Sequence, residues 1–308
     1  MHVAFIGDIH GRFGRVHEWL ATLEKQLGVA LDHVFAVGDV EAYADADRHR
    51  EQAARKAMAP EFATLARSND PVREIHFIGG NNEDFAALHD HPRGHHFAGG
   101  VDYLGRAGSK QFGAMQFAWL SGIHAPKFLD APIEVPTNAD TRKQAGYFRR
   151  VEIDRVAAMS GIDVLLTHEW PKGLVARARA EKSGIQRALR AYRFPWIGNA
   201  YARDIADRLQ PAWLFCGHSH IALATTIHHE SGRETRVACL DQAARPDAAV
   251  FWLEWNDGRA VRAGWGIDGS VAWREDERWD ESKTPAVGDA GKSSEETDEP
   301  KSERRKKK

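Results

Sequence analysis

Short apolar runs bounded by glycine recur along the first two thirds of the chain. Six of them are almost continuously hydrophobic: HVAFIGD (2–8), HVFAVGD (33–39), EIHFIGG (74–80), FAWLSGI (117–123), DVLLTHE (163–169) and WLFCGHSH (213–220). Unbroken apolar runs of this length are typical of strands that are covered on both faces. We therefore predict buried strands at these six positions.

Amphipathic helical patterns lie between several of these runs. GRVHEWLATLEKQLG (14–28) carries apolar residues at helical spacing and ends on Gly28, and YARDIADRLQP (201–211) ends before Pro211. Three later runs, ALATTIHH (222–229), RVACLD (236–241) and AVFWLEW (249–255), follow one another without helices. This order predicts an α/β fold, a layered β-sandwich flanked by helices, whose later strands pair antiparallel.

The overall composition narrows the class of protein. The 308 residues are 43% hydrophobic and 28% charged with a net charge of −2, which argues against bulk attraction to nucleic acid but allows a local basic patch. Cys216 and Cys239 lie in apolar runs, so we expect buried free thiols and no disulfide. No apolar stretch is long enough to span a bilayer, and no basic region precedes the first strand. We expect a cytoplasmic enzyme or binding protein without a membrane partner.

The composition changes sharply near Asp280. The sequence DESKTPAVGDAGKSSEETDEPKSERRKKK has almost no large apolar residues, so we predict a disordered charged tail over 281–308. The preceding residues 1–280 are expected to form one domain. The basic cluster from Arg304 to Lys308 either contacts nucleic acid or an acidic surface, or is simply solvated.

Polar side chains follow the ends of the predicted strands. Open α/β sheets place their ligand crevice at the carboxyl ends of the strands, so these side chains are expected to converge. Carboxylate, imidazole and amide oxygen together are suitable ligands for two first-row divalent metals. A single Asp between two metals can bridge the two ions with its two oxygens. The predicted ligands are Asp8, His10, Asp39, Asn81, His168, His218 and His220.

The ordered motifs GDIHG, GDVE, GNNE, TH and GHSH resemble those of the calcineurin-like metallophosphoesterase superfamily, over Met1 to Asp241. Within it, the flanking stretches FIGGNNE, YLGRAG, LSGI, LLTHEWPKG, LQPAWLFCGHSH and ACLD are similar to the RNA lariat debranching enzymes. The chain does not resemble the protein Ser/Thr phosphatase branch, whose second motif continues with an Asp-Arg pair where this sequence has Val40-Glu41-Ala42.

The resemblance implies a ligand set for each metal. Asp8, His10, Asp39 and His220 would hold the first ion, and Asp39, Asn81, His168 and His218 the second. A shared metal-bound hydroxide would attack phosphorus in line with the leaving oxygen. Mn²⁺, Fe²⁺ and Zn²⁺ suit these ligands equally well.

Two positions depart from the family pattern. Lariat debranching enzymes typically have cysteine where this chain has Asp8, and an Asp there should strengthen the first metal site. Asn82 stands where the family has its catalytic histidine, and an amide donates a hydrogen bond but cannot give up a proton. Three outcomes stay open: another acid replaces it, substrates with good leaving groups are used, or the site binds without efficient turnover. His124 is the first candidate acid, and His91, His95 and His96 are weaker ones.

Two segments are candidates for substrate contact. The basic segment 172–193, with Arg187 and Arg190, is either a track for a nucleic-acid backbone or a solvated helical face. In the first case Trp170, Tyr192 or Phe194 would offer a stacking face. The proline-containing segment 124–150 is long and aperiodic, and we interpret it as a cap or recognition loop beside the metals.

These observations favour a dinuclear metal-dependent phosphodiesterase that acts on RNA, single-stranded nucleic acid or nucleotides. Branched 2′–5′ RNA is a candidate substrate by resemblance. The alternatives are a catalytically weak module that binds metal and nucleic acid, and a small-molecule phosphatase of the same fold.

Overall fold

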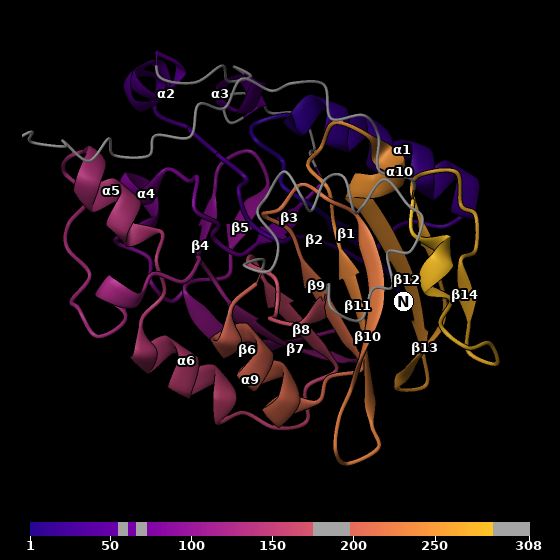
Figure 1. The fold of residues 1–308 in the computed structure, drawn as a ribbon. Helices are drawn as coiled ribbons and strands as arrows, with labels where there is room; N and C mark the ends of the chain where they lie inside the picture. Colours follow the sequence, from indigo (N-terminus) through magenta and orange to yellow (C-terminus); the bar gives the residue numbers. More distant parts are fainter. Residues whose placement is uncertain (55–60, 66–72, 175–197, 286–308) are drawn as a thin grey trace, which may run out of the picture.

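Two mixed β-sheets pack face to face, with helices on their outer faces (Figure 1). The computed structural model describes residues 1–54, 61–65, 73–174 and 198–285. This arrangement confirms the predicted α/β layered sandwich. Among the described residues, no helix is both long and apolar enough to cross a membrane.

The first sheet contains eight strands in the order β14-β13-β12-β1-β2-β3-β5-β4. β1, β2, β3 and β5 run parallel, and β12, β13, β14 and β4 pair antiparallel with their neighbours. The bounds are β1 His2–Ile6, β2 His33–Ala36, β3 Ile75–Phe77, β4 His95–Phe97, β5 Val101–Tyr103, β12 Val250–Asn256, β13 Arg259–Trp265 and β14 Trp273–Arg274.

The second sheet contains six strands in the order β10-β11-β9-β8-β7-β6. Its bounds are β6 Ala107–Phe112, β7 Met115–Leu120, β8 Val164–Thr167, β9 Trp213–Cys216, β10 Leu223–His228 and β11 Glu234–Cys239. The prediction that the later strands pair antiparallel is right for β10–β11 and β12–β13. The prediction is wrong for β11 and β12, because these two strands do not pair with each other. β11 pairs in parallel with β9, whereas β12 pairs with β1 in the other sheet.

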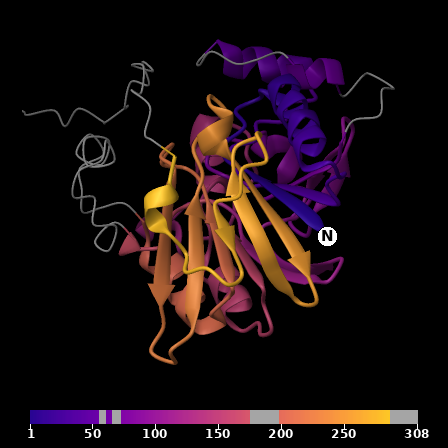
Figure 2. The same ribbon diagram turned by 90° about the vertical axis from the view of Figure 1, so that its right-hand side faces the viewer.

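Helices cover both outer faces, as the view from the side shows (Figure 2). The α-helices are α1 Phe13–Leu27, α2 Ala46–Ala53, α3 Glu61–Leu65, α4 Phe85–Leu88, α5 Ala139–Ala145, α6 Arg150–Ala157, α9 Ala200–Leu209 and α10 Pro246–Ala249, and the 3₁₀ helices are η1 Pro126–Phe128 and η2 Glu281–Lys283. The predicted helix after β1 is confirmed. It ends where Gly28 adopts a left-handed conformation and donates its N–H to the Glu24 carbonyl.

An aromatic core fills the space between the sheets. The rings of Phe5 and Phe215, from opposite sheets, stack with centroids 3.6 Å apart, and Phe35 stacks on Phe117 at 4.3 Å. Both cysteines are buried free thiols, as predicted. This packing holds the strand ends of the two sheets at a fixed mutual position.

Two predicted loop regions are more ordered than expected. Segment 124–150 contains η1 and α5, and the partly buried Arg106 anchors it by donating to the Ala145 and Tyr147 carbonyls at 2.7 Å each. The start of the predicted disordered tail, 281–285, is ordered instead: η2 packs beside β10, where the Ala224 N–H donates to the Thr284 hydroxyl at 2.8 Å. The remainder of the predicted tail lies outside the described residues.

Candidate metal centre

The predicted ligands converge from both sheets. Asp8, Asp39 and Asn81 follow β1, β2 and β3 of the first sheet, whereas His168, His218 and His220 follow β8 and β9 of the second. Two groups form, Asp8 with His10 and His220, and Asp8 with Asp39 and His168, each with ligand atoms within 4.8 Å of one another. Within each sheet the parallel strands end at one edge, and the face-to-face packing of the two sheets brings these two edges together.

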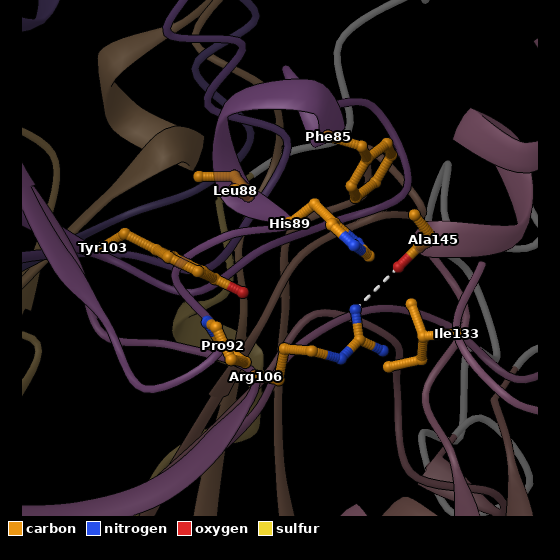
Figure 3. A pocket seen from close by; sticks show the side chains of 8 residues that line it. All are labelled: Phe85, Leu88, His89, Pro92, Tyr103, Arg106, Ile133 and Ala145. Atoms are coloured by element: carbon orange, nitrogen blue, oxygen red, sulfur yellow. Dashed lines mark hydrogen bonds between the residues drawn. The ribbon is translucent and has the colours of Figure 1, made fainter. Parts of the chain in front are cut away.

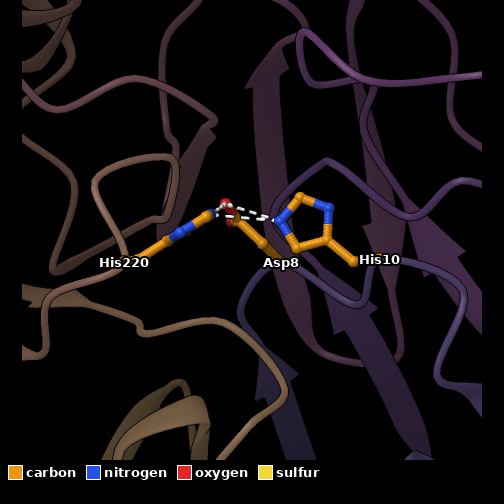
Figure 4. Close-up of side chains that lie close together, drawn as sticks. All are labelled: Asp8, His10 and His220. Atoms are coloured by element: carbon orange, nitrogen blue, oxygen red, sulfur yellow. Dashed lines mark hydrogen bonds and ion pairs between the residues drawn. The ribbon is translucent and has the colours of Figure 1, made fainter. Parts of the chain in front are cut away.

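In the first group, two imidazoles face one carboxylate (Figure 4). His220 Nε2 lies 3.0 Å from Asp8 Oδ2, and His10 Nε2 lies 3.1 Å from His220 Nε2 and 4.0 Å from the same oxygen. The other ring nitrogen of His10, Nδ1, is 2.6 Å from the Glu41 carboxylate. A carboxylate on Nδ1 orients the ring and leaves Nε2 for a metal, as in many metal sites.

The second group resembles the first in that one ring nitrogen of its histidine also contacts a protein oxygen. His168 Nδ1 lies 2.8 Å from the Val37 carbonyl, so Nδ1 donates its proton to this oxygen and Nε2 carries the lone pair that can bind a metal. This Nε2 is 3.3 Å from Asp39 Oδ1 and 3.1 Å from Asn81 Oδ1. The His218 ring packs edge-on against the His168 ring at 5.0 Å.

The cluster is largely buried, and its surroundings shift the pKa values of Asp8 and His218 in the direction that favours metal binding. Burial alone would raise the pKa of Asp8, but the His168, His220 and His10 imidazoles hold it below its usual value. Burial lowers the pKa of His218 to about 4, so its imidazole is neutral at pH 7, the form that binds metals. Buried carboxylates and imidazoles that share one small volume fit a metal site.

The backbone at the centre is unusual. His10, Asp39, Glu41, His218 and His220 all have positive φ angles between 48° and 68°. Non-glycine residues in this region cost about 1–3 kcal/mol each and concentrate at functional sites. These turns therefore lower the stability of the fold, but they orient the side chains toward the metal centre.

Glycine is required at one of these turns. A Cβ atom at Gly80 would collide with the Asp39 carboxylate. The glycine pair before Asn81 and Asn82 therefore allows the β2 and β3 loops to approach each other.

Glu83 joins the two loops that carry Asp39 and Asn81. Its carboxylate accepts N–H bonds from Val40 at 3.0 Å, Glu41 at 2.8 Å and Gly80 at 3.0 Å. Burial and the Asp39 charge raise the pKa of Glu83 well above its usual value, while these N–H groups oppose the shift. Glu83 therefore holds together the loops that carry the predicted ligands Asp39 and Asn81.

Asn82 contacts the predicted bridging carboxylate directly. Its backbone N–H donates to Asp39 Oδ1 at 2.7 Å, and its side-chain amide donates to Asp39 Oδ2 at 2.8 Å. Asn82, which the resemblance places at the position of a catalytic histidine, therefore orients Asp39 in this structure.

A cavity of about 360 Å³ adjoins Asn81 and Asn82. Polar, aromatic and basic side chains line it: Tyr43, Gln52, Asn81, Asn82, Glu83, Phe85, Ile123, Ala139, Arg142, Lys143 and Tyr147. Four of these, Ala139, Arg142, Lys143 and Tyr147, come from segment 124–150. Phe85 also lines a smaller neighbouring pocket of about 180 Å³, into which His89 and the anchoring Arg106 project (Figure 3).

Several predicted residues lie elsewhere. The interpretation of Trp170 as a stacking face is wrong: its side chain is 1% exposed and belongs to the apolar cluster between the second sheet and α9. The turn after β8 directs it into the core. Arg187, Arg190, Tyr192 and Phe194 lie outside the described residues. His124 packs its ring against Tyr201 at 5.1 Å and Phe148 at 5.9 Å.

In the described part of the chain, the contacts of the other candidate acids, His91, His95 and His96, do not involve the metal centre. His91 and His95 stack on each other at 3.8 Å, and His96 pairs with Glu74 at 3.1 Å. Burial lowers the pKa of His124, which disfavours the protonated form that an acid needs.

Comparison with known proteins agrees with this geometry. The family model described as calcineurin-like phosphoesterase matches residues 1–222. The chain belongs to this family. Among relatives, this calcineurin-like phosphoesterase is 28% identical to the lariat debranching enzyme of Danio rerio over 253 residues, which cover 76% of this chain and 43% of the relative.

A second relative and a solved structure extend the comparison. The Homo sapiens lariat debranching enzyme is 25% identical over 294 residues, covering 83% of this chain and 52% of the relative. The chain therefore spans about half the length of the curated relatives it matches. A solved 5′-nucleotidase precursor from Thermus thermophilus superimposes with a TM-score of 0.42 at 13% identity, covering 86% of this chain and 54% of that one.

Sequence reasoning missed the supporting residues of this phosphoesterase. Glu41 and Glu83 end the GDVE and GNNE motifs, so their place in the motifs was a usable signal. Tyr43, Arg142 and Lys143 also line the cavity, but Tyr43 lies far in sequence from the other two, so no local sequence pattern predicts that they meet there.

Proposed function

We propose that this phosphoesterase is a phosphodiesterase that uses two divalent metals and acts on RNA or nucleotides, with branched 2′–5′ RNA as the specific candidate. The observation that carries the proposal is the cavity beside Asn81 and Asn82. It combines the cations of Arg142 and Lys143 with the aromatic rings of Tyr43 and Tyr147. Such a surface favours a phosphate backbone and a stacked base.

The residues divide the work of the reaction. Asp8, His10, Asp39, Asn81, His168, His218 and His220 would hold the ions. When bound, two such metals supply an activated water and neutralise charge on the attacking and leaving oxygens. Glu41 and Val37 hold His10 and His168 in the ligating tautomer, and Glu83 and Asn82 keep Asp39 in position.

The relatives support the choice of substrate. Their printed name, lariat debranching enzyme, points to branched RNA. Part of the cavity wall, Ala139, Arg142, Lys143 and Tyr147, comes from segment 124–150, which supports a role for this segment in substrate recognition.

A substrate panel tests the proposal. Branched 2′–5′ RNA, linear RNA, a cyclic nucleotide and a phosphomonoester are incubated in parallel with Mn²⁺, Fe²⁺ or Zn²⁺. We expect metal-dependent cleavage of the branched RNA that is lost in Asp39→Ala. Preferential cleavage of the monoester would instead identify a small-molecule phosphatase.

A second function, binding without efficient turnover, is favoured by Asn82 because an amide cannot supply a proton. RNA binding that falls steeply with salt, without cleavage of any substrate in the panel, would identify this function. Arg142→Glu should weaken that binding, whereas Arg150→Glu, whose partner is the exposed Asp130, should leave it unchanged.

A further inference from the structure

A second group of imidazoles and carboxylates lies on the first sheet, away from the metal centre. Glu74 directly precedes β3, whereas Asn81 follows the same strand, so the two groups lie toward opposite ends of β3. No step of the proposed reaction uses this group.

Strand register places three of these side chains in one row. His76 on β3 pairs with Asp102 on β5, and Asp102 pairs with His96 on β4. Residues directly opposite on neighbouring strands project to the same face of a sheet. Glu74, two residues before His76, projects to that face as well. Four ionisable side chains therefore meet on three adjacent strands.

The distances show that these groups converge. His76 Nδ1 lies 2.9 Å from Asp102 Oδ2, and His96 Nδ1 lies 3.1 Å from Glu74 Oε1. One ligand atom from each of Glu74, His96 and Asp102 lies within 4.8 Å of the other two. His76 Nε2 is 3.9 Å from Glu74 Oε2.

The group is anchored on one side and open on the other. The side chains of His76 and Asp102 are 6% and 17% exposed, and those of Glu74 and His96 are 49% and 61% exposed. Glu74 and His76 also line a groove of about 500 Å³ that includes Asp32 and His33. Solvent and a hydrated ion can therefore reach the group without unfolding.

We propose that Glu74, His96 and Asp102 bind a divalent transition metal such as Zn²⁺ at a third site, separate from the metal centre. One imidazole and two carboxylates, completed by water, are a suitable donor set for a four-coordinate zinc ion. His76 acts as a positioning residue, because its ring nitrogen holds the Asp102 carboxylate. Binding there ties edge strand β4 to β5 and β3.

Zinc stoichiometry of the full chain tests this site. Wild type, His96→Ala, Glu74→Gln and the control His95→Ala are dialysed against one free Zn²⁺ concentration, and metal per protein is measured by mass spectrometry. His95 neighbours His96 on β4 and projects to the opposite face. We expect wild type and His95→Ala to hold one more zinc per chain than the other two variants.

The comparison does not depend on the metal centre. Zinc bound at the centre is common to all four proteins and cancels in the difference, and Asp39→Asn should lose that zinc while keeping the third. Equal zinc content in all four proteins would overturn the proposal. Loss in His95→Ala would also overturn it, by assigning the ion to the stacked His91–His95 pair. The side chains of Glu74, His95 and His96 are exposed, whereas Asp39 is buried. Circular dichroism checks that each variant is folded.

Discussion

At the scale of single residues, Asn82 determines how this centre differs from its family. Its two hydrogen bonds to Asp39 use both oxygens of the carboxylate that is predicted to bridge the metals. An amide in this position stabilises the ligand geometry, but it cannot protonate a leaving oxygen. Metal binding and turnover are therefore expected to respond differently to substitution at this residue.

Replacing Asn82 by alanine removes the side-chain bond to Asp39 and keeps the backbone bond. Loss of such an outer contact typically lowers metal affinity by about 10–100-fold, so Mn²⁺ binding measured by calorimetry should weaken by that factor. An unchanged affinity would show that Asp39 needs no help from this amide.

Asn82→His should restore a proton donor. For RNA, whose leaving oxygen needs protonation, the rate should rise by about 10²–10⁴-fold. For an aryl phosphodiester with a good leaving group, it should change little. Steady-state kinetics on both substrates checks this. Equal gains on both would mean that the histidine acts by charge or position and not as an acid.

At the scale of elements, the centre depends on two loops, after β2 and β3, which Glu83 joins through three N–H bonds. The Tyr43 hydroxyl adds a bond to the Glu83 carbonyl at 3.0 Å. The strained turns at Asp39 and Glu41 persist because this connection holds them. The loops should therefore loosen together when it is broken.

Glu83→Gln places an amide NH₂ group against at least one buried N–H group. A buried donor without a partner costs about 1–3 kcal/mol, so the free energy of unfolding should fall by that amount or more. Urea unfolding followed by tryptophan fluorescence measures it. The exposed Glu134→Gln serves as the control and should change stability by less than about 0.5 kcal/mol. Equal stability of both variants would exclude the proposed role of Glu83.

At the scale of the whole molecule, the metal ligands come from both sheets of the sandwich. Asp8 and Asp39 belong to the first sheet and His168 and His220 to the second, and Phe5 and Phe215 stack between them. An ion that bonds to both sheets binds only the folded state. Metal binding is therefore coupled to global stability.

Chelation should lower the unfolding temperature of the wild type. A ligand at about 100 times its Kd stabilises the folded state by about 2.7 kcal/mol. Differential scanning fluorimetry with EDTA and then with Mn²⁺ should show a reversible shift. Asp39→Asn should show a much smaller shift, and an equal one would place the stabilising ion elsewhere.

The sequence by itself determined the strands and the ligands at their ends. Apolar runs such as 2–6 and 213–216 form buried strands, and the parallel strands β1 and β2 bring Asp8 and Asp39 to one edge of the first sheet. His168 follows β8 of the second sheet and reaches them because the two sheets pack face to face. Tertiary structure alone decided the burial of Trp170 and the cavity walls from segment 124–150. It also decided the row formed by His76, Asp102 and His96. These features arise from packing and strand register between residues far apart in sequence, which hydrophobic periodicity does not encode.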